Sequence, residues 1–283
     1  MSTESPSARV AVRKTYKLYI GGAFPRSESG RSYPVHGPDG TFLANAALAS
    51  RKDARDAVRA ARAAVGKWSG ATAYNRGQIL YRVAEMLEGR RDQFVTLVDD
   101  PAEVDAAIDR WVWYAGWADK VAQVHGNANP VAGPYFNLSA PEPTGVVALL
   151  APSEPALLGL VSVIAPAIVT GNTVVAVASE ERPLPAVTLA EVLATSDLPA
   201  GVVNLLTGRL AEVAPWLASH QDVDAIDLAG VADPGLARDL EVAAADNLKR
   251  VRRPVERDWS ADPGLGAMLG FLETKTVWHP KGI

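Results

Sequence analysis

The sequence predicts an α/β protein built on a parallel sheet that helices cover on both faces. From residue 145 onward, short apolar runs alternate with helical segments, and this alternation is typical of parallel strands joined by crossover helices. Runs such as 146–150 and 173–177 are apolar almost throughout, which indicates strands buried on both faces. Any ligand site is therefore expected outside the carboxyl ends of these strands.

Helical periodicity precedes the sheet. Ser50 is placed to cap a helix whose apolar residues recur at helical spacing. Comparable patterns begin near Tyr74 and at Pro101, and proline is favoured in the first turn of a helix. Short strands are expected at 17–20 and within 31–49. The remaining elements are strands at 146–150, 173–177, 202–206, 223–229 and 248–251, and helices at 156–170, 186–194, 211–218 and 234–245.

The chain divides into four segments. Residues 1–15 are rich in serine and basic residues and are expected to form a flexible tail. Residues 16–251 hold the helices and the parallel sheet, and two extended segments around a turn predict a hairpin arm at about 134–149. Residues 252–266 are expected to be a linker, and 267–283 a C-terminal segment that contains a final strand.

Composition excludes several classes of function. The 283 residues include no cysteine, which removes disulfides, thiolate catalysis and cysteine metal sites. The four histidines do not lie at ligand spacing, so no metal site is expected. A net charge of −4 offers no attraction for nucleic acid or an anionic membrane. Proline, glycine and glutamate interrupt the longest apolar region, 145–178, which argues against a membrane span and favours a cytoplasmic location.

Several motifs resemble those of the aldehyde dehydrogenase superfamily. Gly171-Asn172-Thr173 leads into the second strand, and Leu198-Pro199-Ala200-Gly201 leads into the third. Tyr114-Ala115-Gly116-Trp117 and Tyr19-Ile20-Gly21-Gly22 are similar to upstream segments of the same family. The resemblance implies a Rossmann-like, NAD-binding domain with N-terminal helices. It also implies a small β oligomerisation arm that combines the hairpin with the C-terminal strand.

The resemblance continues on both sides of an internal gap. Residues 247–251 resemble the point where the family passes from its cofactor-binding half to its catalytic half, and 271–278 resemble its final strand. The resemblance therefore implies that the linker at 252–266 replaces the catalytic domain, together with the nucleophilic cysteine. The chain is similar to a truncated, pseudoenzyme-like member of the family.

Catalytic positions outside this gap also depart from the family. Its oxyanion-stabilising asparagine corresponds to Glu154, which would repel an oxyanion instead of donating to it. The plainer interpretation of Glu154 is a carboxylate near a helix N-terminus. The family's general base corresponds to Pro254, which cannot ionise, and Glu256 lies out of register. We therefore predict no catalytic residue in this chain.

The ribose-binding positions are partly kept. By resemblance, a lysine and a glutamate after the second strand bind the adenosine ribose. The lysine corresponds to Val177, which cannot donate a hydrogen bond. Ser179 and Glu180 match the two positions that close this motif. Glu180 either accepts from a ribose hydroxyl or is simply an exposed loop charge.

The phosphate-side turn keeps both of its glycines. Gly230 and Gly235 either allow backbone amides to meet a pyrophosphate at a helix N-terminus or only begin a helix. The motif's serine is replaced by Val231, and Asp233 adds negative charge where a phosphate would approach. We expect no NAD binding, or weak binding.

These observations favour a non-catalytic, aldehyde-dehydrogenase-like subunit of a hetero-oligomer. Its arm would pair with a full-length, catalytic aldehyde dehydrogenase, which the chain would stabilise or regulate. Two alternatives stay open. One is an NAD-dependent aldehyde oxidoreductase with unconventional active-site residues, and the other is a nucleotide-binding sensor.

Overall fold

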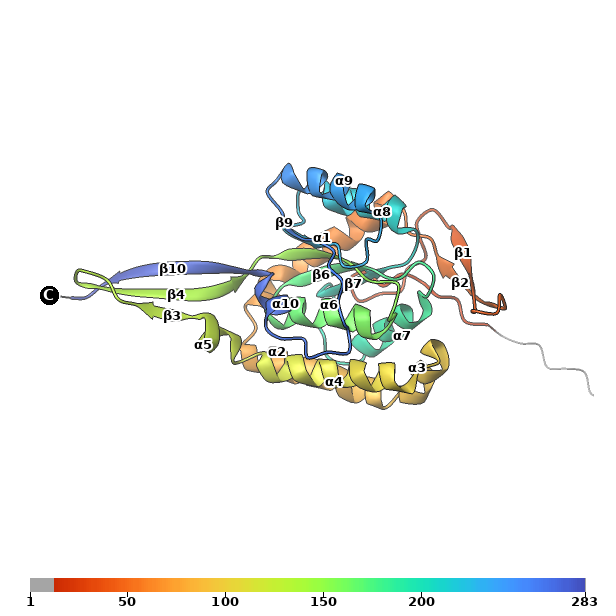
Figure 1. Cartoon of the computed structure of the whole chain (residues 1–283), viewed down its shortest axis with the longest axis horizontal. Helices are drawn as coiled ribbons and strands as arrows, with labels where there is room; N and C mark the ends of the chain where they lie inside the picture. The colour runs from red at the N-terminus through yellow and green to blue at the C-terminus, as the bar shows by residue number, and fades with distance from the viewer. Residues whose placement is uncertain (1–12, 283) are drawn as a thin grey trace, which may run out of the picture.

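The structure is a computed structural model that describes residues 13–282 and centres on a five-stranded parallel sheet (Figure 1). The strand order is β7-β6-β5-β8-β9, and every neighbouring pair is parallel. This confirms the predicted α/β fold with a Rossmann-like parallel sheet. The strands are β5 (Val146–Leu150), β6 (Thr173–Val177), β7 (Val203–Leu206), β8 (Ala225–Asp227) and β9 (Arg250–Arg252).

Helices cover both faces of the sheet. Along β5, Val147 and Leu149 belong to one buried cluster, whereas Val146, Ala148 and Leu150 belong to the other. Because successive side chains of a strand point to opposite faces, a wholly apolar strand needs a layer on each side. One layer holds α6 (Leu158–Val169) and α7 (Leu184–Leu193), and the other holds α1 (Arg51–Ser69), α8 (Leu210–Ala218) and α9 (Pro234–Ala245).

A further helical layer lies outside α6 and α7. It consists of α2 (Ala73–Glu88), α3 (Arg91–Val98) and α4 (Pro101–Trp117). The start of α4 is as predicted, since the Asp100 side chain accepts a hydrogen bond from the amide of Ala102 and Pro101 opens the first turn. Trp111 of α4 is fully buried, so α4 is fixed to the body of the domain.

The short strands predicted within 31–49 are confirmed, whereas the strand predicted at 17–20 is not. A two-stranded sheet joins β1 (Ser32–His36) to β2 (Phe42–Ala47) at the end of the molecule opposite the arm (Figure 1). The expected strand at 17–20 makes only single bridges, from Tyr19 to Leu205 and from Ile20 to Ala23. Gly21 and Gly22 both take positive φ angles, and the tight turn they make ends the extended segment at once. Most of the predicted tail at 1–15 lies outside the described residues.

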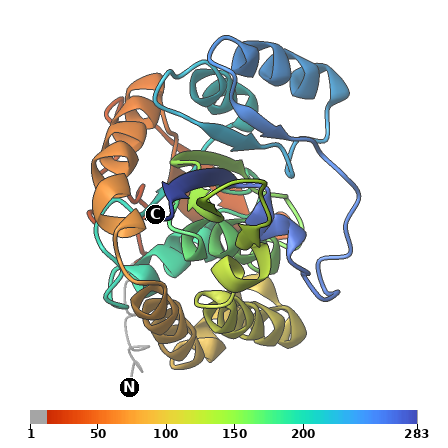
Figure 2. The same ribbon diagram turned by 90° about the vertical axis from the view of Figure 1, so that its left-hand side faces the viewer.

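A long β arm projects from the body of the molecule (Figure 1), and Figure 2 views the molecule along it. Its strand order is β10-β4-β3. The central strand β4 (Tyr135–Pro143) pairs antiparallel with β3 (Asn127–Asn129) and along its whole length with β10 (Leu272–Pro280). The short helix α5 (Val121–His125) precedes β3. The C-terminal strand is therefore part of the arm, which the described residues follow as far as 282.

The hairpin expected at 134–149 needs correction. β4 turns back on β3, which precedes it, whereas 146–150 form the central strand of the parallel sheet. The physical reason is burial. All five residues of β5 are buried, and they could not all be buried in an arm that is exposed to solvent. Gly145 takes a φ of 131° at the turn between the two sheets, a conformation that favours glycine.

The segment between β9 and the arm crosses the body of the domain. It contains α10 (Gly266–Leu269), and Phe271 at its end is fully buried. The carbonyl of Phe271 accepts hydrogen bonds from Thr144 N at 3.1 Å and from Asn172 Nδ2 at 2.9 Å. The two long strands of the arm, β4 and β10, are thus attached to the parallel sheet at their base.

Residues 13–282 contain neither a membrane-spanning helix nor a cluster of metal-ligating side chains. No helix there is long and apolar enough to cross a membrane. No group of three or more histidine, aspartate or glutamate side chains in that part of the chain is arranged to hold a metal ion.

Candidate functional site

A cleft of about 450 Å³ opens at the carboxyl ends of the central strands. The loop after β5 contributes Glu154, the loop after β8 contributes Gly230, and the segment after β9 contributes Pro254 and Glu256. Sequence resemblance assigned Glu154, Gly230 and Pro254 to oxyanion, phosphate and general-base positions, and the structure brings these three positions together. Among the described residues that line the cleft, Glu154 and Glu256 are ionisable and Ser153 carries a hydroxyl, whereas none is a cysteine, histidine or lysine.

Glu154 is held by an arginine. Arg182 Nη1 donates to the two carboxylate oxygens of Glu154 at 2.9 and 3.0 Å, and Arg182 Nη2 donates to the carbonyl of Val98 at 2.7 Å. A carboxylate fixed in this way presents only acceptor atoms. It supplies no hydrogen bond to a developing oxyanion, which is what this position would need for acyl chemistry.

The start of α6 is closed by a second carboxylate. Glu103, which is buried, reaches across from α4 and accepts hydrogen bonds from the amides of Leu157 at 2.6 Å and Leu158 at 3.1 Å. These amides would otherwise be free donors at a helix N-terminus. Sequence reasoning missed Glu103 because its partners lie more than fifty positions away along the chain. No local motif signals such a contact.

The ribose-side residues are engaged within the protein. Ser179 is buried and its hydroxyl accepts a hydrogen bond from the amide of Arg182 at 3.0 Å. Glu180 Oε2 accepts from the amide of Leu210 at 3.3 Å, at the first residue of α8. Val177 is buried in the apolar cluster beneath α1 and α8. Glu180 therefore caps the start of α8. Val177, which stands where the family has a lysine, contributes no hydrogen-bond donor.

Gly230 is required by packing. Its amide donates to the carbonyl of Leu150 at 2.7 Å, and a Cβ at this position would lie only 2.0 Å from the carbonyl oxygen of Ala151. The loop after β8 is thus pressed against the end of β5. The role of Gly230 in this structure is close backbone contact, and no ligand is needed to explain it.

The N-terminus of α9 is capped by its own sequence. The Asp233 side chain accepts a hydrogen bond from the amide of Gly235 at 2.9 Å. One of the amides that would meet a phosphate is therefore taken, and the cap itself carries negative charge. Together with Val177 and Glu180, this arrangement fits a dinucleotide poorly. Of the four residues predicted to bind cofactor, Ser179 and Glu180 follow β6, Gly230 follows β8, and Gly235 lies in the first turn of α9. β6 and β8 are the two strands that flank β5.

A buried ion pair lies beside the cleft. Asp227 at the end of β8 is fully buried, and Arg252 Nη1 donates to its Oδ2 at 3.1 Å. Burial raises the pKa of Asp227, although the charge of Arg252 opposes the shift. The Arg252 guanidinium also lies over the ring of Phe271, 5.1 Å from its centroid. The pair therefore links the edge of the sheet to the base of the arm.

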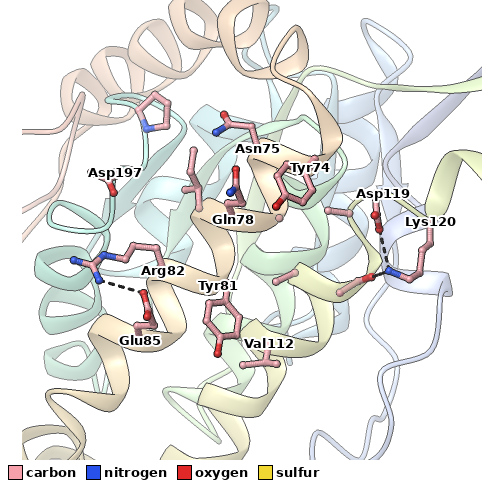
Figure 3. Close-up of a pocket in the computed structure, with 16 residues that line it drawn as sticks. Tyr74, Asn75, Gln78, Tyr81, Arg82, Glu85, Val112, Asp119, Lys120 and Asp197 are labelled. Carbon is pink, nitrogen blue, oxygen red and sulfur yellow. Dashed lines mark hydrogen bonds and ion pairs between the residues drawn. The ribbon is translucent and has the colours of Figure 1, made fainter.

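A wider groove lies elsewhere, on the outer surface of α2 and α4 (Figure 3). Its volume is about 1020 Å³, and Tyr74, Tyr81 and Val112 contribute exposed apolar surface to it. The charged side chains in it include two local ion pairs, Arg82 with Glu85 at 3.1 Å and Asp119 with Lys120 at 2.9 Å. This groove is separate from the cleft at the strand ends.

Comparison with known proteins places the chain. The sequence model that describes the aldehyde dehydrogenase family matches residues 24–253 of this chain. The chain belongs to the aldehyde dehydrogenase family. This confirms the resemblance found in the sequence, and it accounts for the Rossmann-like arrangement of the sheet.

Curated relatives of this aldehyde dehydrogenase family member are about twice its length. Retinal dehydrogenase 2 of Gallus gallus is 34% identical over 261 residues, covering 87% of this chain and 49% of the relative. Aldehyde dehydrogenase family 2 member B4, mitochondrial, of Arabidopsis thaliana is 34% identical over 260 residues, covering 87% and 47%. The chain thus spans about half the length of the curated relatives it matches.

Solved structures agree on the fold. An aldehyde dehydrogenase of Bacillus cereus, solved as its NAD+ complex, superposes with a TM-score of 0.78 at 26% identity, covering 84% of this chain and 50% of the other. PnpE of Pseudomonas sp. WBC-3 superposes with a TM-score of 0.80 at 29% identity, covering 84% and 50%. The shared part is again about half of each longer chain.

Proposed function

We propose that this chain is a non-catalytic, cytoplasmic subunit that assembles through its β arm with a full-length aldehyde dehydrogenase and stabilises or regulates it. The carrying observation is the contrast between a well-formed arm and a strand-end cleft that has no cysteine nucleophile and has Pro254 at the family's general-base position. An arm that projects from the body needs a surface to cover it, whereas the cleft has lost the groups that acyl chemistry requires.

The arm has a free edge. β10 pairs with β4 on one side only, and among residues 13–282 no strand pairs with its other side. An exposed strand edge is a template for another strand, and natural proteins seldom leave one uncovered. The nine residues of β10 are long enough for a partner to add a strand by backbone hydrogen bonds.

The distal part of the arm is apolar on both of its faces. Leu138 lies opposite Val277 on one face, and on the other Tyr135 and Trp278 meet with ring centroids 5.8 Å apart. Between 40% and 57% of each of these side chains is exposed. Exposed apolar surface of this kind is typical of a binding site. The proximal part is charged instead, with ion pairs that join Lys275 to Glu142 and Arg250 to Glu273.

The partner we propose is a full-length member of the same family. The chain spans about half of its curated relatives, so a longer homologue offers strands that this chain does not contain. A partner strand beside β10 would meet apolar residues at the tip and charged residues near the base. The functional consequence would be increased stability or altered activity of the catalytic subunit.

Co-expression with each full-length aldehyde dehydrogenase from the same organism, followed by size-exclusion chromatography, tests this assembly. We expect co-elution with one of them. The double variant Leu138→Glu with Val277→Lys should abolish it, because it replaces apolar surface while keeping an attractive cross-strand pair. Tyr81→Lys on α2 is the control and should co-elute normally. Failure of the unmodified chain to co-elute with any homologue would refute the proposal.

Two alternatives rest on the retained sheet. The likeness to a Bacillus cereus enzyme solved with NAD+ favours residual nucleotide binding, as a sensor or as an oxidoreductase with unconventional residues. The cap that Asp233 places on α9 and the burial of Val177 weigh against both. Reduction of NAD by the purified chain with any aldehyde would favour the enzyme, and tight NAD binding without turnover would favour the sensor.

A further inference from the structure

A third and smaller cavity lies between α4, α6 and the segment that follows β9. Its volume is about 250 Å³. Arg110 and Tyr114 line it from α4, Ser162 lines it from α6, and Arg257 and Trp259 line it from the connecting segment. It is distinct from the cleft at the strand ends, with which it shares no lining residue.

Arg110 brings a buried positive charge to this cavity. The side chain is only 7% exposed, and its hydrogen bonds go to neutral acceptors, namely Ser162 Oγ at 2.9 Å and the carbonyls of Trp259 at 2.7 Å and Ala261 at 3.1 Å. A buried arginine is normally paired with an acid. Three bonds also leave two of the five N–H groups of a guanidinium unused. An anion in the cavity would compensate this charge.

Arg257 adds a second positive charge. Its guanidinium lies 5.4 Å from the centroid of the Trp259 ring, and it forms no ion pair with an acidic side chain in the described part of the chain. The stacked arrangement holds the guanidinium at the cavity while its N–H groups stay available.

Tyr114 supplies a neutral donor. The residue is 1% exposed, yet it lines the cavity. Burial raises the pKa of its hydroxyl to about 12, although three arginines nearby oppose the shift. The hydroxyl therefore stays protonated at neutral pH and can donate to an anion.

The two acidic residues that line the cavity are exposed and bonded locally. Asp258 Oδ1 accepts from the amide and hydroxyl of Ser260, and Asp262 Oδ1 accepts from the amide of Gly264 at 3.0 Å. Both carboxylates are thus committed to turns of the connecting segment, whereas Arg110 and Tyr114 lie buried beneath it. The buried part of the site is therefore positive, and the acids lie at its rim. Burial lowers the pKa of Arg110 and raises that of Tyr114, but the charge of Asp262 still reaches both groups, because it acts to raise both pKa values. A bound anion would therefore compete with this rim carboxylate.

We propose that this cavity binds a small carboxylate, with Arg110, Arg257 and Tyr114 as the groups that recognise it. A carboxylate accepts hydrogen bonds from guanidinium and hydroxyl donors together. The volume lies below the usual range for drug-sized ligands, so the ligand has only a short chain, which Trp259, Pro263 and Ala267 would contact. This proposal is independent of assembly with a partner, and it would make the connecting segment sensitive to a small metabolite.

The test uses the whole chain and a short series of acids. Acetate, propionate and butyrate are titrated by saturation-transfer NMR and calorimetry, with butyramide as the neutral isostere of butyrate and inorganic phosphate as a different anion. We expect saturable binding of at least one carboxylate, none of butyramide, and weaker binding of phosphate. Absence of saturable carboxylate binding, equal binding of butyramide, or preference for phosphate would each overturn the proposal.

Variants identify the site without removing the contacts of Arg110. Tyr114→Phe and Arg257→Gln should each weaken carboxylate binding about tenfold, as expected for loss of a hydrogen bond to a charged group. Arg253→Gln is the matched control, because Arg253 is exposed, lies in the same segment and pairs with Glu241 at 3.0 Å. It should bind as the unmodified chain does. Unchanged affinity in both Tyr114→Phe and Arg257→Gln would rule out this cavity as the binding site.

Discussion

Arg182 holds Glu154 by two hydrogen bonds at the mouth of the strand-end cleft, at 2.9 and 3.0 Å. Arg182 is itself fixed to the carbonyl of Val98, so the loops after β5 and β6 are joined to the end of α3. The position that resemblance assigns to an oxyanion donor is therefore occupied by a salt bridge.

Restoring one catalytic residue should not restore catalysis. Glu154→Asn supplies the amide that family resemblance assigns to this position, but no cysteine exists in the chain to act with it. We expect no NAD reduction with any aldehyde. The lost pair with Arg182 is only partly buried, so the free energy of unfolding should fall by about 1 kcal/mol. Aldehyde-dependent NADH formation in the variant would contradict this reading of the cleft.

Gly230 and Gly235 should respond very differently to substitution. Gly230→Ala places a Cβ 2.0 Å from a backbone oxygen, and overpacking of this kind costs about 1–3 kcal/mol. Gly235→Ala meets only the Asp233 side chain at 3.3 Å and lies in the first turn of α9, so its effect should be near zero or slightly stabilising. Urea denaturation of the two variants measures the contrast. If the two variants lost equal amounts of free energy of unfolding, backbone packing would not be what requires glycine at position 230.

The pair of Asp227 with Arg252 should control stability in a pH-dependent way. Arg252→Met leaves a fully buried carboxylate without its cation, which costs about 3–5 kcal/mol. Burial already raises the pKa of Asp227, and loss of the cation raises it further. The loss in free energy of unfolding should be complete at pH values above that raised pKa. It should shrink as the pH falls through this pKa, because the protonated carboxyl is neutral.

The double variant Asp227→Asn with Arg252→Met provides the control for this pair. It removes both charges but keeps an acceptor for the amide of Ala229, which now bonds to Asp227 Oδ1 at 2.9 Å. We expect it to recover part of the lost stability and to lose the pH dependence. Denaturation curves recorded between neutral and acid pH measure this difference between the two variants. If the stability lost in Arg252→Met did not change with pH, the buried charge would not be its cause.

NAD should bind weakly, and Asp233 should be one reason. We expect NMR titration to detect only weak binding to the unmodified chain. Asp233→Ser keeps a capping hydroxyl and removes the charge, which should tighten binding about fivefold if a charge repulsion of about 1 kcal/mol is lost. Asp239→Asn, an exposed change on the same helix, should have no effect. Tight binding to the unmodified chain would favour the sensor instead.

Local sequence patterns predicted most of the secondary structure. The continuous apolar runs identified β5 and β6, and the helix at 234–245 matches α9 at both ends. Prediction failed for the hairpin, because 135–139 and 146–150 are both extended and adjacent, yet they belong to different sheets. Strand pairing between segments is a tertiary contact. The pairing of β4 with β10 joins residues more than 125 positions apart, and no local pattern records it.

The candidate site shows the same division. Sequence alone determined that no cysteine nucleophile exists, that Pro254 cannot act as a base, and that Glu154 cannot donate to an oxyanion, because these are properties of the side chains themselves. Only the tertiary structure decided that Glu154 bonds to Arg182, that Glu103 closes the start of α6, and that Arg110 is buried and forms no ion pair within residues 13–282. These contacts join segments far apart in the chain, so their energies depend on burial and geometry that packing alone establishes.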